Sequence, residues 1–415
     1  MAPGAISLPP SANGTDGTNG TKEIINGTNL PTKTQNGLPI PAGLDASKLI
    51  ITKSPSPRAV PDAASAFATE DTICTDHMIT CAWDRTRGWS APELKPFGPF
   101  SLMPTASVLH YATECFEGLK VYRGFDGRLR LFRPDCNTRR FLRSAARVSL
   151  PAFDPDELEK LLVALVAFDG PKWLPRDEPG AFLYLRPALI GTQSTLGVCT
   201  PTKALLFVTL SYMKKMDSPG GLKLCTSPED TVRAWAGGFG HAKLGANYGP
   251  SLVAAQAARD KGYDQILWLY GPEGYCTEAG ASNFMVVWTD KESGKTQIVT
   301  APLDDSIILD GITRRSLLQL ARDRLGDEVE VVEKKYTMNE VIEAQREGRL
   351  RETFAVGTAY FVTPVSVVHH RGIDIHIDIG DGYGGKYALL FTQWLKDIMY
   401  GGEDHPWGLV VPEEA

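Results

Sequence analysis

The sequence predicts a protein of the α+β or α/β class, built as two domains behind an unstructured N-terminal tail. Its 415 residues are enough for about two or three domains. Hydrophobic residues make up 43% of the chain and charged residues 22%, the balance of a globular protein with sizeable cores. Apolar runs of strand length alternate with segments of helical periodicity. The expected parts are a disordered tail over 1–64, a small α+β domain over 65–212, a connection over 213–224 and a large domain over 225–415.

Composition argues against several classes of partner. A formal net charge of −6 disfavours nucleic acid and anionic membrane surfaces as ligands. No apolar run approaches the roughly 20 residues that a membrane span needs. The seven cysteines are scattered without a CxxC pair, so we expect free thiols and no metal site. Because no secretory signal is present, we expect a cytoplasmic protein, with the mitochondrion as the alternative compartment.

The predicted tail is rich in Gly, Asn, Thr, Pro and Ser, with Asn-Gly-Thr triplets at Asn13, Asn19 and Asn26. Such a composition buries too little apolar surface to offset the entropy of the chain, which predicts disorder. The triplets match the acceptor pattern for N-glycosylation. Without a secretory signal, low complexity is the simpler interpretation of them.

Strands and helices are predicted to follow one another in the small domain. Asp154 is a candidate N-cap, with Pro155 in the first turn and Glu157 at the capping-box position. Leucines at helical spacing continue this pattern, and Gly170 is expected to end the helix. The other expected elements are strands over 79–83, 119–122, 181–190 and 204–213, a hairpin over 121–132 and a helix over 138–148.

The large domain is expected to alternate short buried strands with amphipathic helices. Thr337 and Glu340 form a candidate capping box at the start of one helix. His369, His370 and His376 lie in a strand-like segment without a carboxylate cluster, so we interpret them as solvated histidines rather than metal ligands. The expected strands cover 265–270, 283–289, 296–300 and 328–332, and the expected helices cover 251–261, 313–325, 338–347 and 386–400.

The candidate for chemistry is Lys243, which lies in a glycine-rich stretch over 235–249. Glycines let the backbone approach a ligand closely. No other Lys or Arg occurs between Arg233 and Arg259, and a lysine with few charged neighbours is a candidate amine for forming Schiff bases. On this stretch alone, a solvated surface charge is the commoner role for a lysine.

Two further segments fit one particular cofactor. Gly311 precedes an amphipathic helix, where the free amides of Ile312 and Thr313 can bind a phosphate; an ordinary loop into an N-cap is the alternative. Glu278 lies among small residues before an apolar strand, where an exposed turn glutamate is the alternative. A reactive lysine, a carboxylate in an apolar setting and a phosphate cradle are together what pyridoxal 5′-phosphate (PLP) requires.

A series of motifs runs through the chain from about residue 75 to residue 411. They are Val108-Leu109-His110-Tyr111-Ala112, Glu114-Cys115-Phe116-Glu117-Gly118, Leu131-Phe132-Arg133-Pro134, Tyr184-Leu185-Arg186-Pro187, Arg233-Ala234-Trp235, Lys243-Leu244-Gly245-Ala246-Asn247-Tyr248-Gly249, Leu267-Trp268-Leu269-Tyr270-Gly271-Pro272 and Gly357-Thr358-Ala359. With these motifs in this order, the chain resembles the branched-chain amino-acid aminotransferases of PLP fold type IV. The resemblance implies a two-domain fold like that of D-amino-acid aminotransferases, with PLP as the cofactor.

The resemblance also implies roles for individual residues. Lys243 is implied to hold the cofactor aldehyde, Tyr248 to hydrogen-bond its phenolate oxygen and Glu278 to pair with its ring nitrogen. The residues implied to hold the phosphate are Arg140, Ile312 and Thr313 through their amides, and Thr358. Those implied to form the substrate pocket are Tyr111, Phe116, Tyr184, Arg186 and, through its amide, Ala359.

Arg186 supports such a role by its own position. It lies in an otherwise apolar strand, and an unpaired buried guanidinium is costly, so we expect it to face a partner or a ligand. A structural salt bridge is the alternative interpretation.

The activity that the resemblance implies is transfer of the amino group of leucine, isoleucine or valine to 2-oxoglutarate. The products are a branched 2-oxo acid and glutamate, and the reversible reaction is expected to be ping-pong. Such amino acids and 2-oxo acids are therefore the expected small-molecule partners. The family is homodimeric, with the loop that carries Tyr111 reaching the active site of the second subunit.

Several pocket positions depart from the family pattern. Ala281 stands where a hydroxyl-bearing Thr is usual, Glu70 stands where an aromatic wall is usual, and 212–217 lacks the usual glycine-rich aromatic string. These departures leave open a fold type IV aminotransferase with a shifted aliphatic or aromatic donor. A PLP-binding protein of low turnover that acts through partners is a further alternative, although Lys243, Glu278 and Arg140 argue against it.

Overall fold

A computed structural model describes residues 42–62, 71–212, 220–359 and 361–413. Most of the predicted tail, Glu70 and residues 213–219 of the predicted connection lie outside the described residues. No helix in the described ranges is long and apolar enough to cross a membrane.

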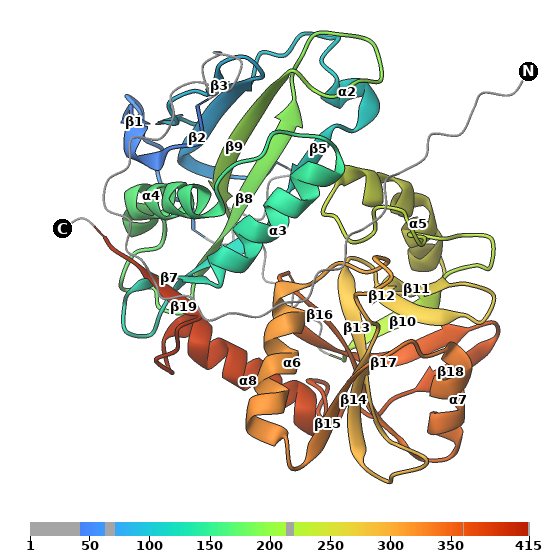
Figure 1. Ribbon diagram of the computed structural model, residues 1–415. Helices are drawn as coiled ribbons and strands as arrows, with labels where there is room; N and C mark the ends of the chain where they lie inside the picture. Colours follow the sequence, from blue (N-terminus) through green and yellow to red (C-terminus); the bar gives the residue numbers. More distant parts are fainter. Residues whose placement is uncertain (1–41, 63–70, 213–219, 360, 414–415) are drawn as a thin grey trace, which may run out of the picture. The chain divides into compact units, whose positions relative to one another are not determined.

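The first sheet is largely antiparallel and has the strand order β1-β4-β2-β9-β8-β6-β7-β19, with β3 beside β2 and β5 beside β8 (Figure 1). Only β1 and β4 pair in parallel among its described strands. Its last strand comes from the C-terminal end of the chain and pairs with β7. The strands are β1 (Ile50–Ile51), β2 (Cys74–Asp84), β3 (Gly88–Trp89), β4 (Glu93–Pro96), β5 (Glu114–Phe116), β6 (Leu119–Arg123), β7 (Leu129–Phe132), β8 (Phe182–Gly191), β9 (Lys203–Ser211) and β19 (Gly408–Val411).

The second sheet is mixed and has the order β12-β11-β10-β17-β16-β13-β14-β15, with β18 beside β17. Strand β10 runs parallel to both of its neighbours, and β14 runs parallel to β15. The strands are β10 (Leu222–Thr226), β11 (Gln265–Tyr270), β12 (Tyr275–Ala279), β13 (Ser282–Thr289), β14 (Thr296–Thr300), β15 (Val329–Glu333), β16 (Leu350–Gly357), β17 (Phe361–His370) and β18 (Ile373–His376).

Helices cover both sheets, as Figure 1 shows. Helices α3 (Pro134–Arg147) and α4 (Pro155–Trp173) lie against the first sheet, and their buried residues share one core with it. Helix α8 (Lys386–Tyr400) contacts β16 and β17 of the second sheet and β6, β7 and β19 of the first. The other helices are α2 (Val108–Tyr111), α5 (Leu252–Asp260), α6 (Ile312–Leu325) and α7 (Met338–Arg346), with short 3-10 turns η1 (Ala46–Lys48), η2 (Gly245–Asn247) and η3 (Gly249–Ser251). This mixed architecture confirms the predicted fold class, whereas the domain boundaries stay a prediction.

Local signals place several helix starts correctly. The side chain of Asp154 accepts a hydrogen bond from the amide of Asp156 at the start of α4, as its N-cap pattern predicts. Thr337 and Glu340 form the predicted capping box of α7. Helix α3, by contrast, begins at Pro134 rather than at 138, because a proline at the first position suits a helix start.

Two expectations from single residues are wrong. Helix α4 continues through Gly170 to Trp173, and the amide of Leu174 donates to the Gly170 carbonyl. A Cβ at position 170 would lie 2.6 Å from the Leu129 side chain, so glycine serves close packing there rather than helix termination. His370 is buried rather than solvated, and its Nδ1 lies 3.0 Å from the hydroxyl of Thr226.

Candidate functional site

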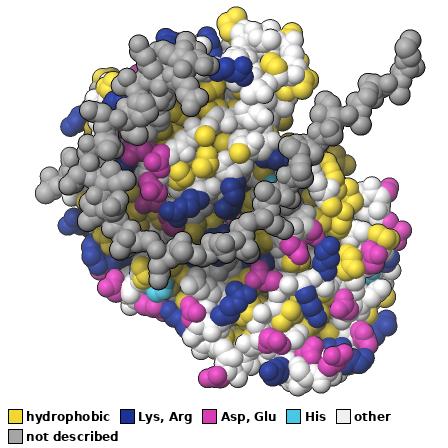
Figure 2. Space-filling model, in the orientation of Figure 1, with side chains coloured by type: hydrophobic (Ala, Val, Ile, Leu, Met, Phe, Trp, Pro, Cys, Tyr) yellow, Lys and Arg dark blue, Asp and Glu magenta, His cyan; other side chains and the backbone are white. Residues whose placement is uncertain are grey.

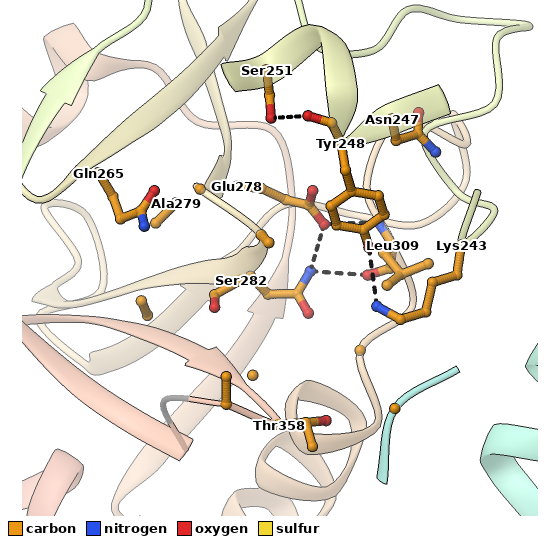
Figure 3. Close-up of a pocket in the computed structure, with 18 of the residues that line it drawn as sticks. Lys243, Asn247, Tyr248, Ser251, Gln265, Glu278, Ala279, Ser282, Leu309 and Thr358 are labelled. Atoms are coloured by element: carbon orange, nitrogen blue, oxygen red, sulfur yellow. Dashed lines mark hydrogen bonds between the residues drawn. The ribbon is translucent and has the colours of Figure 1, made fainter. Parts of the chain in front are cut away.

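A cavity of about 790 Å³ opens between the first sheet, the second sheet and the glycine-rich segment that follows β10. In Figure 3, Thr358 lies at one end of it and Gln265 and Ser251 at the other, with Lys243, Tyr248 and Glu278 between them. Segments far apart in the sequence therefore converge here. The sequence-predicted residues that line the cavity are Phe116, Arg140, Tyr184, Arg186, Lys243, Tyr248, Glu278, Ile312, Thr313, Thr358 and Ala359.

The backbone of Lys243 is held on both sides. Its amide donates to the hydroxyl of Ser144 on α3, at 2.8 Å, and its carbonyl accepts from the amide of Phe116 on β5, at 3.1 Å. A Cβ at position 245 would lie 1.6 Å from a carboxylate oxygen of Glu114, so Gly245 lets this segment pass close to β5. The half-buried side chain of Lys243 thereby points into the cavity.

Tyr248 is the immediate polar partner of that side chain. The Lys243 ammonium nitrogen donates to the Tyr248 hydroxyl oxygen at 3.0 Å. Burial raises the pKa of Tyr248, but the cationic side chains of Lys243, Arg233 and Arg140 outweigh it, and the pKa falls below its ordinary value. The three cations therefore favour the phenolate form of Tyr248 relative to an ordinary tyrosine.

Glu278 is buried on β12, with 3% of its surface exposed, which overturns the alternative of an exposed turn residue. Its carboxylate accepts from the amide of Leu309 at 2.9 Å and from the side-chain amide of Asn283 at 3.3 Å. It also forms an ion pair with Arg233. In the sequence, Arg233 appears only at the end of a cation-free stretch and in the motif Arg233-Ala234-Trp235, so its ion pair with Glu278 was not predicted.

The start of α6 fits an anion. Gly311 is the N-cap and offers no side chain to the free amides of Ile312 and Thr313. A Cβ on Gly311 would lie 2.1 Å from the Asn283 side-chain oxygen, so the close approach of these segments requires glycine. One terminal nitrogen of Arg140 donates to the Asp310 carbonyl, at 2.8 Å, and brings a guanidinium to the same place.

Arg186 lies among aromatic rings in the opposite wall. Its guanidinium carbon is 4.7 Å from the ring centre of Phe116 and 5.0 Å from that of Tyr184, and one nitrogen donates to the Tyr184 hydroxyl at 2.9 Å. Its Nε is buried without a hydrogen-bond partner. Because the structure shows no ion pair of Arg186 with a described carboxylate, the salt-bridge alternative finds no support in this part of the chain.

Sequence reasoning also missed Glu117 and Ser144. Glu117 binds Arg140 through two nitrogens, at 2.7 Å each, and Ser144 lies one helical turn after Arg140 on α3. Glu117 was visible only as one letter of a motif, and a buried carboxylate looks like any surface glutamate when no partner is known. Ser144 carries no signal at all, because its role comes from a contact across 99 residues of sequence.

Some predicted positions lie elsewhere. Tyr111 belongs to the short helix α2, is 37% exposed and does not line the cavity. Ala281 does line it, so a methyl group stands where the resemblance leads one to expect a hydroxyl. Glu70 and residues 213–219 lie outside the described part of the chain.

Comparison with known proteins gives consistent results. The profile of the family described as Amino-transferase class IV matches residues 114–368. The mitochondrial branched-chain-amino-acid aminotransferase of Schizosaccharomyces pombe is 43% identical over 394 residues, which cover 94% of this chain and 91% of that protein. The cytosolic branched-chain-amino-acid aminotransferase of Saccharomyces cerevisiae is 41% identical over 377 residues, with 90% of this chain and 99% of that protein covered.

Solved structures share the fold. A branched-chain aminotransferase from Thermoproteus uzoniensis, crystallised with norvaline, superposes with a TM-score of 0.64 at 24% identity and covers 82% of this chain and 100% of that one. The branched-chain amino acid aminotransferase from Thermobaculum terrenum, in its PLP form, also gives a TM-score of 0.64, at 22% identity, with 82% and 99% of the two chains covered. The fold is therefore that of type IV aminotransferases.

The effect of Lys243 on the pKa of the Tyr248 phenol can be tested by substitution. Replacing Lys243 by Met removes one of the three cations that lower the pKa of Tyr248, so we expect this pKa to rise. The tyrosinate absorbance of the cofactor-free protein is titrated with pH, and the corresponding protein carrying Tyr248→Phe is subtracted to isolate this phenol. If the difference titration has the same midpoint with Lys243 and with Met, the proposed electrostatic contact is wrong.

Proposed function

Because the chain belongs to the class IV aminotransferase family, we propose that it transfers the amino group of leucine, isoleucine or valine to 2-oxoglutarate, with PLP as its cofactor. The products are a branched 2-oxo acid and glutamate, in a reversible ping-pong reaction. The observation that carries the proposal is the cavity in which the amine of Lys243, the carboxylate of Glu278 and the uncapped start of α6 come together.

The described residues fit PLP in charge and chemistry. Bound PLP supplies an electron sink for the electrons released at the substrate Cα. Lys243 would hold the aldehyde, Tyr248 would hydrogen-bond the phenolate oxygen and Glu278 would pair with the ring nitrogen. The phosphate is assigned to Arg140, the amides of Ile312 and Thr313, and Thr358.

Lys243 is the base that moves the substrate Cα proton. Its nitrogen has a partner at hydrogen-bond distance in Tyr248, and the two hydrogen bonds on its backbone limit where that nitrogen can travel. Glu278 is surrounded by donors from Leu309, Asn283 and Arg233, which stabilise its negative charge away from water. Position and charge are thus set before a ligand arrives.

The substrate side is lined by aromatic rings and one guanidinium. Phe116 and Tyr184 offer apolar surface to a branched side chain, and Arg186 brings a guanidinium to the cavity wall that can pair with a carboxylate. The amide of Ala359 is assigned to the substrate carboxylate as well.

A second candidate is an aminotransferase of the same fold with a different aliphatic or aromatic donor. The observation that favours it is Ala281, which lines the cavity without the hydroxyl that is usual in the family. A low-turnover PLP-binding protein that acts through partners is the third candidate.

We expect purified protein with PLP and 2-oxoglutarate to form glutamate from leucine, isoleucine and valine, whereas Lys243→Ala forms none because the base is missing. A panel of branched, straight-chain and aromatic donors, with glutamate measured, separates the three candidates. Glutamate only from unbranched donors would make the second candidate correct. No glutamate from any donor, with PLP bound, would leave the third.

We also propose that the protein is a homodimer, with Tyr111 contributing to the active site of the second subunit. Two adjacent segments, 103–111 and 193–198, expose apolar side chains. A 2.6 Å hydrogen bond between the hydroxyls of Thr105 and Ser194 joins the two segments. Exposed contiguous apolar patches mark interaction surfaces, and Figure 2 shows hydrophobic side chains at the upper end of the view, where Figure 1 places α2. The most exposed are Met103 (62%), Leu109 (57%), Leu196 (62%) and Val198 (91%).

The dimer proposal predicts that the purified protein sediments at twice the mass of one chain. The double variant Leu196→Asp, Val198→Asp places negative charge on this patch. The dissociation constant of its dimer is expected to rise at least about tenfold, which favours the monomer. Tyr383→Asp, at an equally exposed side chain outside the patch, is the matched control. A monomeric wild-type protein contradicts the proposal.

The relatives include a mitochondrial and a cytosolic enzyme. We propose the cytoplasm for this chain, and fractionation of cells that express the full-length protein tests it: recovery with mitochondria overturns the assignment.

A further inference from the structure

One buried carboxylate beside the site has no role in the proposed reaction. Glu117 follows β5 directly, and only 1% of its surface is exposed. A carboxylate in such a place is costly unless it is paired and hydrogen-bonded. Its partners therefore indicate why the fold keeps it.

The partners of Glu117 satisfy both of its oxygens. Arg140 donates from Nε to one oxygen and from a terminal nitrogen to the other, at 2.7 Å each, in the two-pronged geometry that fixes a guanidinium most firmly. The side-chain amide of Asn137 donates to the second oxygen at 2.8 Å. Asn137 and Arg140 lie three residues apart on one face of α3.

The same two elements also hold Lys243. Ser144 of α3, one turn beyond Arg140, accepts from the Lys243 amide, and Phe116, next to Glu117, donates to the Lys243 carbonyl. Glu117 therefore lies where the element that carries Arg140 and the strand that supports Lys243 meet. Burial disfavours its charged form, but Arg140 and Lys243 outweigh this and keep the pKa of Glu117 below its ordinary value.

We propose that Glu117 is a positioning residue with two tasks: it fixes Arg140 for the cofactor phosphate, and its negative charge stabilises positive charge on the Lys243 nitrogen. The inference rests on the proposed function, since both tasks concern the cofactor. The other titratable and charged groups around these residues include Tyr248, Cys115, Arg233, Arg186, Glu278 and Asp310.

The two tasks respond differently to two substitutions. Glu117→Gln keeps the length of the side chain and removes the charge, so both tasks fail. Glu117→Asp keeps the charge but shortens the reach, so the contact with both Arg140 nitrogens is lost while the nearby negative charge remains. The matched control is Glu352→Gln, which alters another buried glutamate that accepts two amides at the start of α8 and does not line the cavity.

The experiment follows the visible absorption band of the PLP-loaded protein. In Glu117→Gln, the midpoint of the pH titration of this band is expected to move about one pH unit lower, because an opposite charge near the Lys243 nitrogen is gone. PLP retention after desalting, measured as a dissociation constant, is expected to weaken on the order of tenfold. Glu117→Asp is expected to weaken retention similarly with its midpoint near that of wild type.

Circular dichroism and thermal unfolding of the cofactor-free proteins report on folding. If Glu117→Gln does not fold, Asn137→Ala takes its place, and losing one hydrogen bond to Glu117 is expected to weaken PLP retention about threefold. The proposal is overturned if the wild type shows the band and folded Glu117→Gln matches Glu352→Gln in midpoint or in retention, or if folded Glu117→Asp matches it in retention. A wild type without the band would instead overturn the proposed function.

Discussion

The backbone of Lys243 is held between helix α3 and strand β5, and the rest of the site depends on this constraint. Its two hydrogen bonds come from Ser144 and Phe116, which are distant in sequence from Lys243. A lysine side chain is long and loses much rotational freedom when it is ordered. With the backbone fixed, only the side chain remains to be placed, and the Tyr248 hydroxyl provides its end point.

Buried charge explains why the side chains around the cavity have so many ion-pair and hydrogen-bond partners. Arg140, Arg233, Lys243, Glu117 and Glu278 are charged groups that lie wholly or partly away from water. Each has a desolvation cost that only paired and hydrogen-bonded partners offset. The pairs Glu117–Arg140 and Glu278–Arg233 supply such partners, so that a charged ligand enters a site whose groups are already oriented.

Sequence reasoning found the parts whose chemistry is visible in one segment. Lys243 stands out among glycines, Gly311 stands out before a helix, and Asp154 and Thr337 carry the local signals of helix caps. The family resemblance then supplied the cofactor, the fold type and the assignment of single residues. The class of fold agrees with the structure, and the residues that the resemblance names line one cavity, with the exception of Tyr111.

Residues whose role comes from long-range packing stayed hidden. Gly170 has the pattern of a helix stop, but it is required by the Leu129 side chain of β7. His370 has the pattern of a solvated residue, but the register of β17 turns it toward Thr226 of β10. The roles of Glu117 and Arg233 depend on ion pairs with Arg140 and Glu278, which lie far from them in the sequence. A single sequence does not show which residues from distant segments come into contact.

The role proposed for Lys243 is tested most directly by identifying the residue that carries the cofactor. The purified protein is loaded with PLP, reduced with borohydride and digested, and the peptides are mapped by mass spectrometry. We expect the reduced cofactor to be attached to the peptide that contains Lys243, and to that lysine within it. Attachment to a different lysine, or no attachment to a protein that is fully loaded, would contradict this role.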